Sequence, residues 1–357
     1  MKRTGSIYFL VALVALSIPT GGRAASMLVA RVALSDLFPM LPGIVENCTP
    51  VFLSDNTVAV LARTKAVRGD HYLPSNVVVG VLHLGQGTIT LATSFSMPAD
   101  REEVQAIGTT HLLIRGRRRA TVYSSDLKTA TELLVRPTIS STAGSKMVAI
   151  NEDGNWRVNQ IIPHESKVTG GTGTIRAVSD QVAMVSQSGR LRSTALDGHL
   201  LGEFAFSAEG NVIEIASAGQ LFLNEHDHPR LVDFTGRTQF RISPPQGWGF
   251  RHSWSADGSR MLFNNFTRTI DAQQKESEWV GRVLTFGLGA PNEDSNGELI
   301  RVISPSDGRA CFSLDSPGIL FGVPGELHAD ISRSGRLVVI ATRKDILLYR
   351  LPATCDE

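Results

Sequence analysis

Residues 253–263 read SWSADGSRMLF, and residues 329–340 read ADISRSGRLVVI. Each stretch places a short polar turn directly before a run of apolar residues. A turn containing serine and glycine that leads into a short apolar run is typical of two antiparallel strands joined tightly. Two copies of the same step in one chain predict a repeated β unit.

The turn-and-strand step occurs seven times, and further extended segments follow each copy. Successive turns lie 30 to 77 residues apart, with two consecutive intervals of 36. A self-similar unit of this size, made of four short strands, is the sequence signature of a propeller blade. The apolar strands of the step are TVAV (57–60), HLLI (111–114), MVAI (147–150), VAMV (182–185), VIEI (212–215), MLFN (261–264) and LVVI (337–340).

The two ends of the chain predict how the ring closes. The seventh unit supplies three strands before the chain ends, and MLVARVAL (27–34) precedes the first unit without a partner. The sequence therefore predicts an all-β chain that forms a single domain over residues 25–357. We expect a seven-bladed β-propeller of four-stranded antiparallel blades, with the N-terminal strand completing the last blade.

The two opening stretches resemble the Ser-x-Asp-Gly-Lys/Arg pattern of WD40-like and TolB-like propeller repeats. The Gly-His and Trp-Asp dipeptides of WD40 repeats are absent. Motifs of this kind specify a turn and a core strand, so the resemblance implies a fold and no particular activity.

Residues 1–24 have the pattern of a signal peptide. Lys2 and Arg3 precede an apolar run of twelve residues (7–18), and Gly22 and Ala24 supply the small residues of a cleavage site. The run is shorter than the ~20 residues of a membrane-spanning helix. We expect a secreted or periplasmic protein without a membrane span after cleavage, the alternative being a buried N-terminal helix.

The composition and charge exclude some partners and favour a folded domain. The chain is 42% hydrophobic and 19% charged, and removal of residues 1–24 changes its formal charge from +1 to −2. Nucleic acid is therefore not expected as a partner. No phosphate-cradling glycine loop is present, and no cofactor is expected.

The longest predicted loops gather on one face of the expected disc. Second-to-third loops and connections between blades share that face, and they cover residues 61–75, 243–252, 265–278 and 305–327. The loop 289–297 is expected on the opposite face, between the strands 279–288 and 298–304. Long loops on a rigid scaffold are where binding is usually found.

Aromatic and basic residues in the long loops are the candidate binding residues. The alternative for Tyr72 and Trp248 is that they pack their own loops. The candidates are Arg68, His71, Tyr72, Trp248, Arg251 and His252.

Two charged clusters have competing interpretations. Residues 225–228 read Glu-His-Asp-His, but two aligned histidines fall short of the three or four ligands of a metal site. A solvated turn is favoured there, and no metal is expected. Residues 115–119 read Arg-Gly-Arg-Arg-Arg at a second-to-third hairpin, and either a solvated turn or a polyanion site would suit them.

Three cysteines allow one disulfide and one free thiol in an exported protein. Cys48 follows the closing strand and Cys355 follows the last blade's third strand, so we expect Cys48 to pair with Cys355. A Cys311–Cys355 bond is the rival, and three free thiols are the remaining possibility.

No common hydrolase or metalloprotease motif is present in the sequence. The favoured function is therefore a non-catalytic binding module for an unknown protein or glycan ligand. The alternative is a propeller hydrolase or lyase acting on an extracellular polysaccharide or glycoconjugate, with Asp70, Asp271 and Glu276 meeting at the axis. A degenerate propeller held in an envelope complex is a third possibility.

Overall fold

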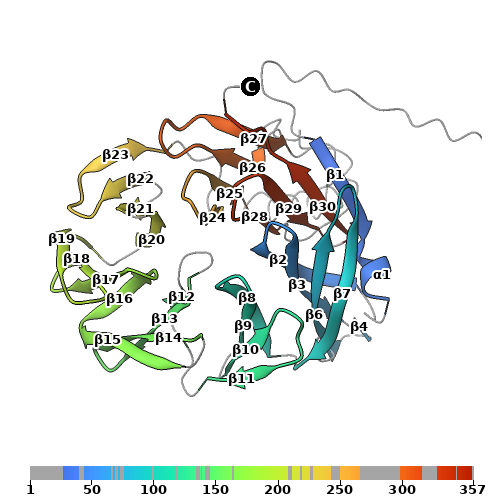
Figure 1. Cartoon of the computed structure of the whole chain (residues 1–357), viewed down its shortest axis with the longest axis horizontal. Coiled ribbons are helices and arrows are strands. Elements are labelled where there is room, and N and C mark those ends of the chain that lie inside the picture. The colour runs from blue at the N-terminus through green and yellow to red at the C-terminus, as the bar shows by residue number, and fades with distance from the viewer. Residues whose placement is uncertain are drawn as a thin grey trace, which may run out of the picture.

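Seven four-stranded antiparallel sheets surround a central axis in the computed structural model of the chain (Figure 1). In six of the sheets the strand that comes first in the chain lies nearest the axis, and in the seventh sheet β28 (His328–Ile331) does. The predicted seven-bladed propeller is therefore confirmed. The structure describes residues 27–355 except 40–43, 66, 69–70, 73–75, 99, 117–118, 134–136, 138, 141–144, 163–164, 208–210, 218, 226–227, 243–249, 266–297, 316–327 and 343.

The first three blades follow the chain from the inside outward. A two-stranded hairpin, β4 (Val67–Arg68) and β5 (His71–Tyr72), extends the second-to-third connection of blade 1. Blade 1 contains β2 (Ile44–Ser54), β3 (Thr57–Lys65), β6 (Asn76–Leu84) and β7 (Ile89–Met97). Blade 2 contains β8 (Arg101–Ile107), β9 (His111–Gly116), β10 (Ala120–Ser124) and β11 (Ala130–Glu132). Blade 3 contains β12 (Ile139–Ser140), β13 (Met147–Glu152), β14 (Asn155–Gln160) and β15 (Ser166–Thr172).

The next three blades repeat the same order. Blade 4 contains β16 (Thr174–Val178), β17 (Val182–Gln187), β18 (Arg190–Ala195) and β19 (Leu200–Ala205). Blade 5 contains β20 (Asn211–Ser217), β21 (Gln220–Glu225), β22 (His228–Asp233) and β23 (Thr238–Arg241). Blade 6 contains β24 (Phe250–Trp254), β25 (Met261–Asn265), β26 (Glu298–Ile303) and β27 (Ala310–Asp315).

Blade 7 joins the two ends of the chain, as predicted. Its inner strands are β28 (His328–Ile331), β29 (Leu337–Ala341) and β30 (Asp345–Arg350), and its outer strand is β1 (Met27–Ala33). β1 runs antiparallel to β30, from Met27 opposite Arg350 to Ala33 opposite Asp345. Figure 1 shows the blue N-terminal strand beside the red C-terminal one.

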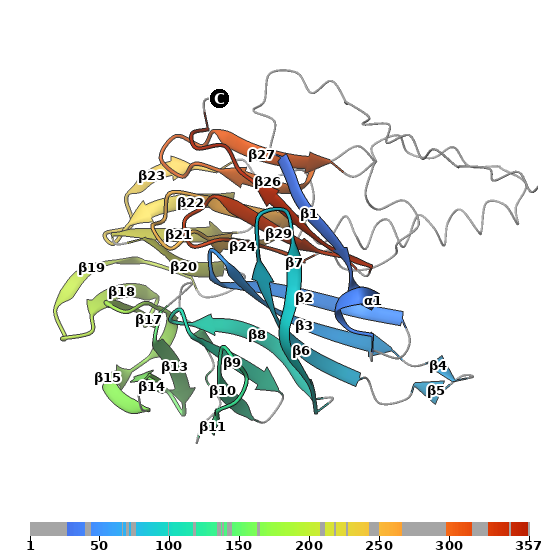
Figure 2. The same ribbon diagram turned by 45° about the vertical axis from the view of Figure 1, so that its right-hand side comes forward.

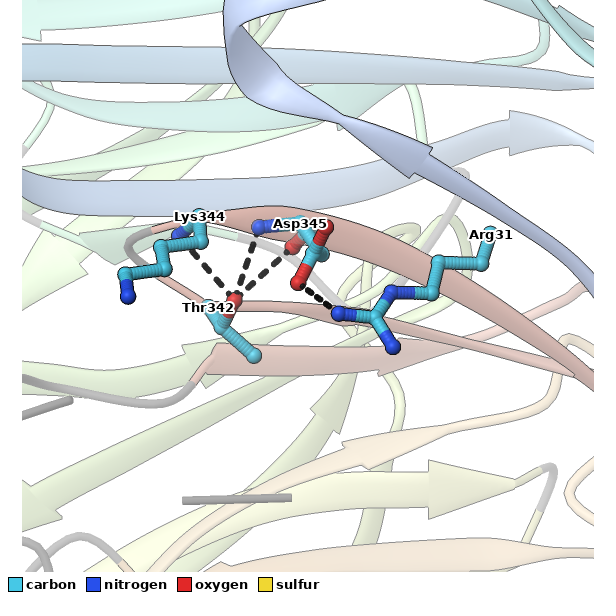
Figure 3. A network of polar contacts seen from close by, with 4 residues as sticks. All are labelled: Arg31, Thr342, Lys344 and Asp345. Atoms are coloured by element: carbon cyan, nitrogen blue, oxygen red, sulfur yellow. Dashed lines mark hydrogen bonds and ion pairs between the residues drawn. The ribbon is translucent and has the colours of Figure 1, made fainter. Parts of the chain in front are cut away.

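Apolar burial and main-chain pairing hold the closure together. Ala30 on β1 is buried with residues of blades 1 and 7, as are Leu34 and Leu37 of the short helix α1 (Leu34–Leu37). In Figure 3, Arg31 donates a hydrogen bond to Asp345 (2.7 Å) beside the turn that the Thr342 hydroxyl organises. The Arg31 side chain is 64% exposed. An ion pair so exposed contributes at most about 1 kcal/mol.

The burial of each strand follows its place in the blade. All six residues at 77–82 of the third strand β6 are buried, because neighbouring blades cover both faces of the sheet. The outer strand β7 instead alternates between buried or half-buried and exposed residues. Phe38, which follows α1, lies so close to Gly80 that a methyl group there would overlap its ring, with 2.6 Å to Cζ and less to Cε1. The closing segment therefore packs against blade 1 as well as blade 7.

Blade 6 differs from its predicted strand assignment. The third position belongs to β26 and the fourth to β27, whereas the predicted third strand, 279–288, lies outside the described residues. The predicted loop 305–327 is wrong because it contains β27. The loop 289–297 was also misplaced, since it belongs to the second-to-third connection between β25 and β26. Two charged residues in the sequence ELIRVI made this central strand look like an outer one.

Blade 5 also begins one strand later than predicted. VIEI (212–215) belongs to the innermost strand β20, so the step at Gly210-Asn211 leads into the first strand. The missed strand is β22, which pairs with β21 from His228 to Asp233 despite containing Pro229. The turn at 226–227 therefore joins the second and third strands and lies on the other face from the one predicted. Within the described residues no three His, Cys, Asp or Glu side chains gather as metal ligands.

The predicted Cys48–Cys355 disulfide is wrong. The bond joins Cys311 to Cys355, and Cys48 is a buried free cysteine. Cys48 lies on β2, the innermost strand of blade 1, whereas Cys311 lies on β27, the outermost strand of blade 6. The chain after β30 passes the outer part of blade 6, so radial position decides the pairing. Burial raises the pKa of the Cys48 thiol to about 12.

Candidate functional site

The second-to-third connections and the connections between blades share one end of the ring, called here the long-loop end. Short turns join most strand pairs there, but residues 66–75 separate β3 from β6 and residues 266–297 separate β25 from β26. The β4–β5 hairpin projects past the ends of β3 and β6 (Figure 2). The chain thus places its largest insertions on one end of a rigid ring.

The predicted binding residues belong to two different blades. Arg68 pairs with His71 across the β4–β5 hairpin, and Tyr72 pairs with Val67, so three candidates share one projecting element. Arg251 and His252 lie on β24, the innermost strand of blade 6. Trp248 lies outside the described residues.

His252 lies between blades 5 and 6. Its side chain is 8% exposed, and its Nε2 lies 2.7 Å from Oε2 of Glu214 on β20. The ring of Phe222 packs on it with 4.3 Å between centroids, and Trp254 Nε1 donates to the same Glu214 oxygen at 3.3 Å. The sequence reasoning missed Glu214 because its partners are 38 or more residues away. A binding role for His252 stays a prediction, as it does for the other five candidates.

Four arginines form a connected group at the long-loop end of blades 1 and 2. Arg63 is near the end of β3, Arg101 begins β8, Arg115 is on β9 and Arg119 precedes β10. We call these four residues the arginine cluster. Sequence reasoning had singled out 115–119 but missed the other two, although each lies where a strand meets this end of the ring.

Main-chain carbonyl groups link the cluster. Arg63 Nη2 donates to the carbonyl oxygen of Arg101, and Arg101 Nη1 donates to that of Arg119 at 3.2 Å. The Arg119 carbonyl also accepts from the Gly116 amide at 2.8 Å, which closes the β9–β10 hairpin. A Cβ atom at Gly116 would lie 2.7 Å from the Asp100 carbonyl oxygen and 2.9 Å from Arg101 Nη1, so this close packing requires glycine.

The carboxylates near the cluster neutralise part of its charge. Arg115 is ion-paired with Glu103, and Arg119 lies 3.5 Å from Glu132. These pairs join strands of blade 2, and their carboxylates are more than half exposed. Arg63 and Arg101 have only carbonyl partners within the part of the chain that the structure describes.

A separate carboxylate lies where three blades meet at the axis. Asp330 on β28 accepts a hydrogen bond from the Phe52 amide of blade 1 at 2.7 Å, and Ser253 of blade 6 is its neighbour. Burial raises the pKa of Asp330 to about 6, although the amides of Phe52 and Ile331 and the Ser253 hydroxyl favour its ionised form. A carboxyl group with such a pKa changes its charge near neutral pH.

Comparison with known proteins shows a shared fold. No family model matches the chain, and no curated protein matches it. The structure described as "KlHsv2 with loop 6CD replaced by a Gly-Ser linker" aligns with a TM-score of 0.51 and 9% identity, over 92% of this chain and 98% of that one. A chain of "Crystal Structure of Mitotic Checkpoint Complex" aligns with a TM-score of 0.50 and 12% identity, over 98% and 99%. The chain therefore has a WD40-like propeller fold.

Among the described residues, no helix is both long and apolar enough to cross a membrane. The expected cleavage site at Ala24 lies outside the described residues.

Proposed function

We propose that the protein is an exported, non-catalytic module that binds a protein partner through the long-loop end of its ring. The observation that carries this proposal is the projection of the β4–β5 hairpin from that end, next to the arginine cluster. Hairpins and loops held on a rigid scaffold are well suited to recognition, because little ordering entropy is lost when they bind.

Two observations support export. Residues 1–24 have the charge, apolar run and small residues of a signal peptide. The Cys311–Cys355 disulfide fits an oxidising compartment, since disulfides rarely persist in the cytosol. N-terminal sequencing of the native protein should begin near Ala25, and recovery of an intact Met1 would contradict export.

Binding through the long-loop end is tested by capture from an extract of the native host. The bait is residues 25–357, compared with a variant whose residues 66–75 are replaced by a short Gly-Ser linker. The matched control replaces residues 196–199, a third-to-fourth turn on the opposite end. We expect the wild type and the control to retain the same partner and the 66–75 variant to lose it. Equal capture by all three would contradict the assignment of this end.

A propeller hydrolase is the second candidate, and Asp330 is the observation that favours it. A carboxyl group with a pKa of about 6 suits a general acid, and this one lies on an innermost strand. Glycoside hydrolysis normally needs a second carboxyl group across the scissile bond. Turnover of a polysaccharide that is abolished by Asp330→Asn would favour this candidate over the binding module.

A further inference from the structure

The arginine cluster contains buried positive charge without a matching carboxylate. Arg101 is 7% exposed, and its guanidinium has the Arg119 carbonyl as its hydrogen-bond acceptor. Its Nε, and that of Arg115, is buried with no hydrogen-bond partner among the described residues. Arg63 is likewise bound to a carbonyl. Two neighbouring guanidinium groups thus have acceptors that carry only partial negative charge.

Such an arrangement is costly unless something else compensates for it. A buried charge is destabilising when it lacks both an opposite charge and a full set of hydrogen bonds. A guanidinium binds a carboxylate more strongly than a neutral carbonyl, since the two N–H groups match two oxygens. Arg101 has a buried, unpaired Nε–H and an Nη1 bound only to a carbonyl, so its positive charge is matched by no carboxylate within hydrogen-bond distance among the described residues.

The local charge indicates which anion fits. The four arginines are accompanied by three described carboxylates: Glu103, Glu132 and Asp100, whose Oδ2 would lie 3.2 Å from a Cβ at Gly116. Among these described side chains the arginines outnumber the carboxylates by one, and the carboxylates limit the negative charge of an anion that can bind beside them, which favours a singly charged carboxylate. A phosphate dianion or a sulfated polymer would meet three carboxylates within the same small surface. The near-neutral chain as a whole also lacks the field that attracts polyanions.

We infer that the arginine cluster is a docking site for an acidic segment of a protein partner, with a glutamate or aspartate side chain of the segment bound at Arg101 and Arg63. This inference rests on the proposed function and names the chemistry of the partner. The ring supplies the rigidity, because Arg63 belongs to blade 1 and Arg101 to blade 2. The carboxylate bridges two blades whose relative position the packed core determines.

The test uses a fluorescein-labelled peptide of alternating glutamate and glycine as its probe. Its fluorescence anisotropy is followed during titration with residues 25–357 at low salt, where charge interactions are least screened. We expect saturable binding, and an increase in the dissociation constant of about tenfold or more for the double variant Arg63→Gln/Arg119→Gln. Arg101→Gln should have at least the same effect. If Arg101→Gln does not fold because Arg101 is buried, the double variant still tests the inference.

The matched control is Arg192→Gln on β18 of blade 4. Arg192 is also a half-exposed arginine on a strand, ion-paired with Glu203 at 3.0 Å, but on another blade. The Arg192→Gln variant should bind the probe as the wild type does. Thermal melting of all variants checks that each is folded. An equal loss of binding in the control, or none in the cluster variants, would overturn the inference.

Competition distinguishes the other anions. Heparin or inorganic phosphate that binds the cluster more tightly than the peptide, with the same dependence on Arg63 and Arg119, would overturn the assignment to an acidic protein segment. The proposed function fails in a different way. It fails if replacement of residues 66–75 leaves capture of the partner unchanged. The present inference fails alone if that partner is still held by Arg63→Gln/Arg119→Gln.

Discussion

The C-terminal segment 351–355 is a strap between blades 7 and 6, and its disulfide lies in the apolar cluster that these two blades share. After β30 the chain reaches β27, where Cys355 is bonded to Cys311. Arg260, which precedes β25, donates from Nη2 to the carbonyl oxygens of Pro352 at 2.7 Å and Ala353 at 2.9 Å. The perturbation that tests the strap is the double variant Cys311→Ala/Cys355→Ala.

The expected loss of stability follows from the length of chain that the bond encloses. The two cysteines are 44 residues apart. In the loop-entropy treatment, a disulfide that closes a loop of that length raises the free energy of the unfolded chain by about 4 kcal/mol at 25 °C. For a mature domain of roughly 330 residues, average unfolding entropies convert this into a decrease of about 6 °C in the melting temperature.

The assay is thermal unfolding followed by circular dichroism, with and without dithiothreitol. Reductant should lower the melting temperature of the wild type toward that of the double variant, which also lacks the two sulfur atoms and should not respond to reductant. The Cys48→Ala variant is the matched control, because Cys48 is as buried as Cys311 but lies outside the bond. It should keep its response to reductant. A wild type that is indifferent to reductant, or a Cys48-containing disulfide peptide in non-reducing mapping, would refute the reasoning.

Three further predictions concern the axis and the closing strand. Folding raises the pKa of Asp330 to about 6, above its unfolded value of about 3.9, so the folded state binds this proton more tightly than the unfolded state does. The free energy of unfolding should therefore fall by about 2–3 kcal/mol as the pH rises from 4 to beyond 6. Asp330→Asn should remove that loss. In urea unfolding, the free energy of unfolding of the variant relative to that of the wild type should therefore be higher at pH 8 than at pH 4, and the same relative value at both pH values would contradict this prediction. Gly80→Ala should destabilise by about 1–3 kcal/mol in urea, because the added methyl group overlaps the Phe38 ring, and an unchanged midpoint would argue against that packing. Deletion of residues 27–33 should cause aggregation, since it exposes the edge of β30, whereas Arg31→Ala should cost less than 1 kcal/mol in the same melts; a deletion that remains monomeric and melts like the wild type would contradict closure by β1.

Most of the fold was predictable because it depends on patterns that repeat within a few residues. The polar turns with glycine or aspartate and the four-residue apolar strands indicated the blades, and the unpaired strand at 27–34 indicated the closure. The errors arose where a strand lacked that pattern. β22 contains Pro229, and β26 begins with Glu298 and has Arg301 in the middle of its apolar residues, so neither resembled a central strand.

The candidate site was less predictable, since its contacts join residues far apart in the chain. The run 115–119 was visible as a basic segment, but nothing local indicated that Arg63 and Arg101 meet it. His252 looked like a loop residue suited to an interface, and the structure places its side chain between two blades beside Glu214. Burial and pairing of this kind depend on how neighbouring blades stack.

The sequence by itself determined the class of fold, the number of blades and the strand that closes the ring, because hydrogen bonding between successive strands follows from turn chemistry and alternating burial. Only the tertiary structure decided the disulfide, the charge left unmatched at Arg101 and the raised pKa of Asp330. Each of these depends on the distance from the axis and on which blades come together. Cys48 and Cys311 are equivalent as residue types, but one lies on an innermost strand and the other on an outermost strand, where the end of the chain passes.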